Sequence, residues 1–186
     1  QREENEKEII TPMQSLILDG NTLTVEDVYR CSRDVSKISF SAASKKRMLA
    51  SRKLVEEWVR KGETIYGVTT GFGELSNVRI SPEHLEELQT NLIVSHSAGA
   101  GEPLPYEVAR AMTILRLNAL AKGYSGIRLE TMEFFRKVFN AGIIPIIPSK
   151  GSVGSSGDLA PLAHLVLTML GQGKVWYRDA VMDSGL

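Results

Sequence analysis

Ser155, Ser156 and Gly157 are the residues of this chain whose types and spacing could create a new chemical group. They lie within GSVGSSGDLAPLAH, residues 151–164, directly before an apolar segment. Because glycine has no Cβ, a tight bend here would allow the Gly157 amide nitrogen to approach the carbonyl carbon of Ser155. If this five-membered ring closes and loses water, and Ser156 then eliminates its hydroxyl group, the backbone becomes a conjugated electrophile.

A second interpretation of the same glycine and serine residues is an anion site. The amide groups at a helix N-terminus and the helix dipole attract phosphate. The segment lacks the lysine of the nucleotide-binding pattern GxxxxGK[ST], and Lys150 precedes its glycines. Short Gly/Ser motifs are weak by themselves, so the rest of the chain must decide between a ring and an anion site.

Four further segments accompany this motif. They are LDGNTLTVEDV (residues 18–28), YGVTTGFG (66–73), LQTNLIVSHSAGAGEPL (88–104) and RLNALAKGYSGIR (116–128). In this order the five segments resemble the family of aromatic amino acid ammonia-lyases and 2,3-aminomutases. The resemblance covers nearly everything from Leu18 onward, and it leaves a phosphate-binding α domain as a minor alternative.

The resemblance implies a prosthetic group that the chain makes from itself. Family members carry 4-methylidene-imidazol-5-one (MIO), usually formed from Ala-Ser-Gly, and here Ser155-Ser156-Gly157 would form it autocatalytically. Since Ser155 replaces the alanine, the ring would carry a hydroxymethyl group in place of methyl. The methylidene carbon comes from Ser156, so this change is compatible with cyclisation. The alternative is a non-catalytic assembly segment in which the tripeptide stays linear.

Tyr66, in YGVTTGFG, matches the catalytic tyrosine of the family. In the implied reaction the substrate amine adds to the electrophile, a base removes a proton from the substrate Cβ, and ammonia leaves. A phenol has an ordinary pKa of about 10, so Tyr66 needs nearby donors or positive potential to act as this base near neutral pH. A glycine-rich loop can close over the substrate, and the resemblance places the backbone of Gly73 along it.

Ser95 and His96 occupy the pair at which the family distinguishes substrate side chains. Phenylalanine-selective members tend to be apolar here, whereas tyrosine- and histidine-using members are polar. A buried imidazole without a polar partner would be unsatisfied, so phenylalanine is disfavoured. The pattern LQTNLxxSHSAG is similar to tyrosine 2,3-aminomutases, and histidine ammonia-lyases usually carry Asn where this chain has Thr69. We therefore expect tyrosine as substrate, with histidine as the alternative and with lyase and aminomutase chemistry both open.

Four further polar residues have weaker assignments. Asn118 and Arg128 are candidates for the active-site wall, while structural hydrogen bonding and helix capping are equally open for them. We expect His164 in the core or behind the site, and His84 on a solvated face among glutamates.

Composition excludes several functional classes. Lys plus Arg equal Asp plus Glu at 22 each, so the chain has no general attraction to nucleic acid or to an acidic membrane surface. Its single cysteine, Cys31, excludes an intrachain disulfide framework, and no Cys/His cluster has metal-ligand spacing. The sequence shows neither a signal peptide nor an apolar run of membrane-spanning length. We expect a cytoplasmic enzyme that uses no metal and no nucleotide.

Hydrophobic spacing and capping residues predict a mainly α fold with short strands and a glycine-rich loop at 66–73. One predicted helix begins near Val25, and further helices are predicted over residues 44–60, 82–94, 108–120, 129–139 and 159–170. We expect the last of these to be buried because it is almost wholly apolar. Ile17-Leu18 should form a short strand before a turn. Prolines make residues 143–149 an extended connector.

We expect residues 1–14 to be a polar tail and residues 15–186 to be the N-terminal MIO-bearing domain of the ammonia-lyase fold. The resemblance implies a later helical bundle, which supplies the arginine for the substrate carboxylate, and a homotetramer with active sites shared between subunits. The chain ends at Leu186, before such a bundle. We therefore expect this piece to be inactive without the remaining C-terminal portion.

Overall fold

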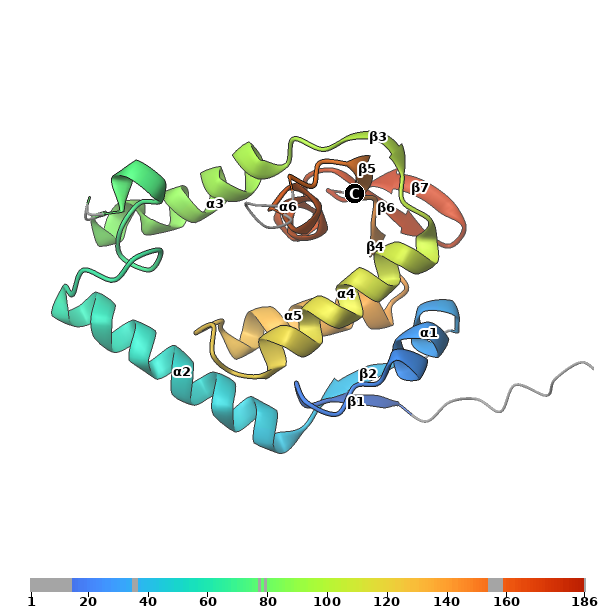
Figure 1. Ribbon diagram of the computed structural model, residues 1–186, viewed down its shortest axis with the longest axis horizontal. Coiled ribbons are helices and arrows are strands. Elements are labelled where there is room, and N and C mark those ends of the chain that lie inside the picture. The colour runs from blue at the N-terminus through green and yellow to red at the C-terminus, as the bar shows by residue number, and fades with distance from the viewer. Residues whose placement is uncertain (1–14, 35–36, 77, 79, 154–158, 186) are drawn as a thin grey trace, which may run out of the picture.

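The structure, a computed structural model, describes residues 15–185 except 35–36, 77, 79 and 154–158. Helices dominate this part of the chain and short strands connect them, as the sequence predicts (Figure 1). The helices are α1 (Val25–Arg33), α2 (Ala42–Lys61), α3 (Leu85–His96), α4 (Tyr106–Ala121), α5 (Leu129–Asn140) and α6 (Leu159–Leu167). Short 3₁₀ helices are η1 (Gly73–Leu75), η2 (Pro82–His84) and η4 (Thr168–Leu170). The predicted tail, 1–14, lies outside the described residues.

Capping residues set the bounds of the first two helices. At α1, the Thr24 hydroxyl accepts a hydrogen bond from the Asp27 amide (3.1 Å) while the Asp27 carboxylate accepts one from the Thr24 amide (3.0 Å), a reciprocal capping box. At α2, the Ser41 hydroxyl accepts from the Ser44 amide at 3.1 Å, and Gly62 ends the helix with φ of +69°. Helix α2 therefore starts two residues before its predicted first residue, 44.

The strands form three small sheets that hold distant segments together. Strands β1 (Leu16–Leu18) and β2 (Ile38–Phe40) pair in parallel, and β3 (Ala100–Pro103) pairs antiparallel with β5 (Pro148–Lys150). The third sheet has the order β4 (Ile144–Pro145), β6 (Lys174–Tyr177) and β7 (Ala180–Asp183). The predicted extended connector is thus β4 and the start of β5, and it brings residue 150 beside residue 100.

Helix α4 passes through the middle of the molecule and carries much of the core (Figure 1). Its buried apolar side chains are Ala109, Ile114, Leu117 and Ala121. Arg110 is also buried, and its Nη2 donates to the carbonyl oxygens of Cys31 and Asp34 at 3.0 Å each, at the end of α1. Its guanidinium also lies 4.5 Å from the Phe139 ring centroid. The partial negative charge at a helix C-terminus and the aromatic face together stabilise this buried cation.

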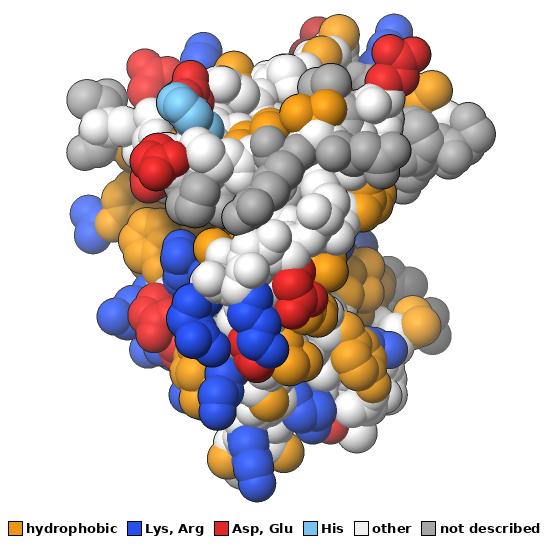
Figure 2. Space-filling view, turned by 90° about the vertical axis from the view of Figure 1, so that its left-hand side faces the viewer, with side chains coloured by type: hydrophobic (Ala, Val, Ile, Leu, Met, Phe, Trp, Pro, Cys, Tyr) orange, Lys and Arg blue, Asp and Glu red, His pale blue; other side chains and the backbone are white. Residues whose placement is uncertain are grey.

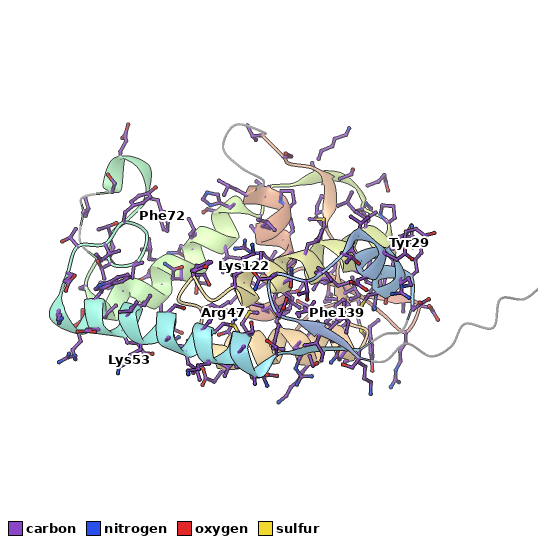
Figure 3. All side chains as sticks on the ribbon, turned by 60° about the horizontal axis from the view of Figure 1, so that its bottom comes forward. Tyr29, Arg47, Lys53, Phe72, Lys122 and Phe139 are labelled. Atoms are coloured by element: carbon purple, nitrogen blue, oxygen red, sulfur yellow. The ribbon has the colours of Figure 1, made fainter. Side chains whose placement is uncertain are left out.

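Arg47 joins α2 to the end of α4, where Figure 3 shows it beside Lys122. Its Nε donates to the Lys122 carbonyl oxygen at 3.0 Å, and its Nη2 donates to the Asp19 carbonyl oxygen at 2.6 Å. The Ser44 hydroxyl donates to the carbonyl oxygen of Ala121 from the same helix. These bonds fix the turn after β1 against both helices.

Helix α6 is less buried than its composition predicts. The helix ends at Leu167 and a 3₁₀ turn, η4, follows. Ala163 and Leu165 are buried, but Leu159 and Leu170 at the two ends of the predicted helix are 47% and 39% exposed. Helix α6 packs on α3, β4 and β5 but leaves these end residues exposed, so the prediction of a buried helix is correct only in part.

The surface of the described residues carries charge but neither a membrane helix nor a metal cluster. On the face shown in Figure 2, Lys and Arg side chains gather over the lower part of the molecule. Across the described ranges, no helix combines the length and apolar character needed to cross a membrane. In the same residues, no group of three or more His, Cys, Asp or Glu side chains could hold a metal ion.

Candidate active site

The loop that follows α2 holds Tyr66 outward and Thr69 inward. Tyr66 is 62% exposed, and its ring meets the edge of Phe72 with centroids 6.0 Å apart. Thr69 is 3% exposed; its hydroxyl donates to the Glu63 carbonyl oxygen at 2.6 Å and accepts from the Ile65 amide at 2.9 Å. The buried threonine therefore anchors the loop while the predicted catalytic phenol stays accessible.

Thr70 anchors the same loop from its other side. The side chain is fully buried, accepts from the Gly67 amide at 3.2 Å and donates to the Gly71 carbonyl oxygen at 2.9 Å. The Gly71 amide in turn donates to the Val78 carbonyl oxygen at 3.1 Å. The sequence predicts a glycine-rich loop at residues 66–73, and these hydrogen bonds shape that loop into a series of turns.

Gly73 lies where the loop turns into η1, and its backbone is accessible. Its φ is +58°, a conformation that favours glycine. Apart from Gly73 and its two chain neighbours, no described residue has an atom within 4 Å of a Cβ added there. The open space suits a backbone that lines a ligand, and the substrate contact itself stays a prediction.

Ser95 and His96 lie in the last turn of α3, with Ser95 exposed and His96 half-buried. Nδ1 of His96 lies 2.8 Å from the carbonyl oxygen of Leu92, and the Ser95 hydroxyl donates to the same oxygen at 3.1 Å. A carbonyl oxygen only accepts, so Nδ1 carries the proton and Nε2 of the neutral ring is an acceptor. The helix thereby fixes which atom His96 can offer to a ligand.

The structure separates Tyr66 from His96 by much of the length of α3. Val68 lines a pocket of about 700 Å³ together with Gln89, near the start of α3, whereas His96 is its last residue. At about 1.5 Å per residue, the step from Gln89 to His96 spans roughly 10 Å. Figures 1 and 3 show the loop with Phe72 beside the N-terminal end of α3, away from α6. A single chain thus does not join the predicted base to the predicted substrate-binding pair.

The described flanks of residues 154–158 do meet the end of α3. A Cβ added to Gly151 would lie 3.0 Å from Cβ of Ala160, on the first turn of α6, and 3.2 Å from Cα of Gly99. Helix α6 also packs against α3 (Figure 1). The described segments on the two sides of residues 154–158 therefore lie close to each other and to Gly99, three residues beyond His96. The predicted ring-forming residues, 155–157, lie outside the described residues.

His164 has a role that the sequence pattern does not show. Its Nε2 accepts a hydrogen bond from the Gly99 amide at 3.0 Å, although the two residues are 65 positions apart. Burial lowers the pKa of the His164 imidazole below its ordinary value of 6.5. The closely spaced glycines around residue 99 indicate that another side chain packs tightly there. They do not indicate which residue supplies that side chain.

The remaining polar candidates have structural contacts. The Asn118 side-chain oxygen accepts from the Gly20 amide at 2.9 Å, so Asn118 holds the turn after β1. Arg128 precedes α5 and lines the 700 Å³ pocket beside α2. Nδ1 of His84 lies 3.2 Å from a carboxylate oxygen of Glu87, and both side chains are exposed, which confirms the solvated face predicted for His84.

Curated proteins similar to this chain include histidine ammonia-lyases. That of Caldanaerobacter subterraneus subsp. tengcongensis is 52% identical over 165 residues, which cover 89% of this chain and 32% of the relative. That of Streptococcus sanguinis is 52% identical over 167 residues, 90% of this chain and 33% of the relative. The chain thus spans about a third of the length of the curated relatives that it matches.

Solved structures of related enzymes and a family profile also match this chain. Histidine ammonia-lyase from Trypanosoma cruzi is 44% identical with a TM-score of 0.85, over 92% of this chain and 33% of that one. Tyrosine aminomutase from Streptomyces globisporus is 39% identical with a TM-score of 0.86, over 92% and 32%. The profile described as "Aromatic amino acid lyase" matches residues 23–185. On these matches, the chain belongs to the aromatic amino acid lyase family.

Proposed function

We propose that the full-length protein eliminates ammonia from an aromatic L-amino acid, with an MIO group formed from Ser155-Ser156-Gly157. The family match over residues 23–185 carries this proposal. The close approach of Gly151 to Ala160 supports it, because it brings together the two described segments that flank the proposed ring-forming residues. When present, MIO supplies an electrophile that turns the substrate amine into a better leaving group.

In this proposal, His96 orients the substrate ring. Its Nδ1 proton is held by the Leu92 carbonyl oxygen, so Nε2 accepts a hydrogen bond from the polar end of the substrate. Both an imidazole N–H and a phenol O–H can donate to it, whereas the ring of phenylalanine cannot. Gly73 would line the substrate with its backbone, and Ser95 would help hold the His96 ring through their shared contact with Leu92.

Tyr66 would remove the Cβ proton at a site completed by another subunit. Its phenol is 62% exposed and its ring meets the edge of Phe72, which Figure 3 shows beside the N-terminal end of α3, whereas His96 is the last residue of that helix. A homotetramer in which the loop of one copy reaches α3 of another would join the two residues. The segments missing relative to the longer relatives would supply the carboxylate-binding arginine.

We favour histidine as substrate over tyrosine. The curated relatives at 52% identity are named histidine ammonia-lyases, whereas the tyrosine aminomutase is 39% identical. Two features of the sequence favour tyrosine, the pattern LQTNLxxSHSAG and Thr69. The Thr69 hydroxyl is buried and bonded within the loop to Glu63 and Ile65, so it reports loop architecture and not a substrate contact. Tyrosine remains the second candidate because of the similarity to the tyrosine aminomutase.

Product analysis of the full-length protein tests this assignment. Histidine, tyrosine and phenylalanine would each be supplied at equal concentration, and free ammonia, the α,β-unsaturated acid and the β-amino acid would be quantified. We expect ammonia and the unsaturated acid from histidine. Predominant β-amino acid would identify an aminomutase. No product from any of the three, with an intact mass that matches the unmodified sequence, would instead favour a non-catalytic segment with a linear tripeptide.

A further inference from the structure

His164 joins two segments that the proposed reaction needs side by side. Its imidazole Nε2, on α6, accepts from the amide of Gly99 at 3.0 Å. Gly99 follows His96 by three residues, and α6 begins just after residues 154–158. One hydrogen bond therefore connects the end of the predicted substrate-binding helix to the helix that follows the predicted ring.

The contact around this bond leaves little room for adjustment. A Cβ added to Gly99 would lie 2.9 Å from His164 Nε2 and 3.2 Å from the Lys150 carbonyl oxygen. From the other side, a Cβ added to Gly151 would press on Cα of Gly99 and on Ala160. We name Gly99, Gly151, Ala160 and His164 the glycine junction. Because Gly99 and Gly151 have no side chains, their backbones can approach each other and the His164 imidazole closely.

The bond requires a neutral imidazole with its proton on Nδ1. An amide N–H needs a lone pair, and a protonated ring would direct a second N–H toward it. The half-buried setting of His164 disfavours the charged ring and lowers its pKa. The ring is thus held in the form that accepts from Gly99.

We propose that His164 is a positioning residue for the ammonia-lyase reaction, which sets the place of His96 through the Gly99 amide. This inference rests on the proposed function. His164 has no contact with substrate in this account; it holds the segment after α3 so that Nε2 of His96 points toward the substrate ring. Loss of the acceptor should therefore change substrate preference as well as rate.

The first test compares His164→Leu, which removes the acceptor, with His164→Gln, whose amide oxygen can take the place of Nε2. In the full-length protein we expect His164→Leu to lower kcat/KM for histidine by about tenfold to hundredfold. It should also reduce the preference for histidine over phenylalanine, whereas His164→Gln should remain within about threefold of wild type. His84→Leu, at an exposed histidine, is the matched control. Equal losses in the Leu and Gln variants, or an unchanged preference ratio in His164→Leu, would overturn the proposal.

Gly99→Ala provides an independent variant that keeps both bonding groups but pushes the imidazole away. We expect it to lower kcat/KM in the same direction, and the double variant with His164→Leu to lose no more than the larger single loss, because both break one bond. Additive losses would refute the inference. If His164→Leu does not fold, the Gly99→Ala and His164→Gln variants test the role of His164. Wild-type kinetics in Gly99→Ala would then refute that role. Wild-type protein without activity and without loss of water would instead refute the proposed function.

Discussion

Nδ1 of His96 lies 2.8 Å from the carbonyl oxygen of Leu92, one turn earlier in α3. In the neutral imidazole, this contact places the proton on Nδ1 and leaves Nε2 as the hydrogen-bond acceptor. The residue that the sequence pattern assigns to substrate choice is thus oriented by its own helix, before any substrate arrives.

Replacement of His96 by leucine should change substrate preference. We expect kcat/KM for histidine and tyrosine to fall by about hundredfold, since their polar ring atoms would be left unpaired. The value for phenylalanine should stay level or rise. Steady-state kinetics of the full-length protein with the three amino acids would measure this, with His84→Leu as control. A uniform loss for all three would contradict a role in selectivity.

Tyr66→Phe should lower kcat by about 10²-fold to 10⁴-fold, because it removes the proposed base. The loop that carries Tyr66 lies beside the N-terminal end of α3, whereas His96 is the last residue of α3. A site shared between subunits therefore predicts that defects in these two residues complement each other. Co-expression of Tyr66→Phe subunits with His96→Leu subunits should restore activity, as some sites then combine an intact loop with an intact α3. Purified mixed oligomers with two different tags would be assayed. Activity no higher than that of either variant alone would contradict a site shared between subunits.

Thr69 variants separate loop stability from substrate choice. Thr69→Val should lower the free energy of unfolding by about 1–3 kcal/mol, since it removes two hydrogen bonds and leaves the Glu63 carbonyl oxygen and the Ile65 amide without their partner. Thr69→Ser keeps the hydroxyl and serves as control. Thr69→Asn should leave the order of preference between histidine and tyrosine unchanged. Urea denaturation and kinetics test the two claims, and an inverted order in Thr69→Asn would show that residue 69 contacts substrate.

Glu133 gives a pH-dependent link between α2 and α5. Its two carboxylate oxygens lie 2.8 Å from Lys45 Nζ and 2.6 Å from Arg136 Nε. Burial raises the pKa of Glu133, but the bonds from Lys45 and Arg136 outweigh it and hold the pKa below the ordinary 4.5. The stabilisation is therefore complete well above pH 4.5 and is lost as the pH falls through the lowered pKa.

Glu133→Gln should accordingly destabilise the protein by about 0.5–1 kcal/mol at pH 7 and by progressively less at acid pH. Urea denaturation at a series of pH values would measure this difference. Glu56→Gln, which breaks an exposed pair with Arg52 on α2, is the matched control and should cost less than about 0.5 kcal/mol. A penalty for Glu133→Gln that does not vary with pH would contradict the assigned pKa direction.

Local signals in the sequence predict the helices well because helix ends are decided locally. Thr24 and Gly62 act within one turn of their own positions, so hydrophobic spacing and capping suffice. The partial exposure of α6 and the buried state of Thr69 and Thr70 depend on neighbours that spacing does not specify. The Gly99–His164 bond joins residues 65 positions apart. For the same reason, motif order could propose roles for Tyr66 and His96 but could not show that one chain keeps them apart.

The intact mass of the full-length protein tests the central claim most directly, because cyclisation of Ser155-Ser156-Gly157 with loss of the Ser156 hydroxyl removes two water molecules. We predict a mass two waters below that of the sequence, with the deficit located in the peptide that contains residues 155–157 and not reproduced in Ser156→Ala. A wild-type mass equal to that of the unmodified sequence would contradict the account.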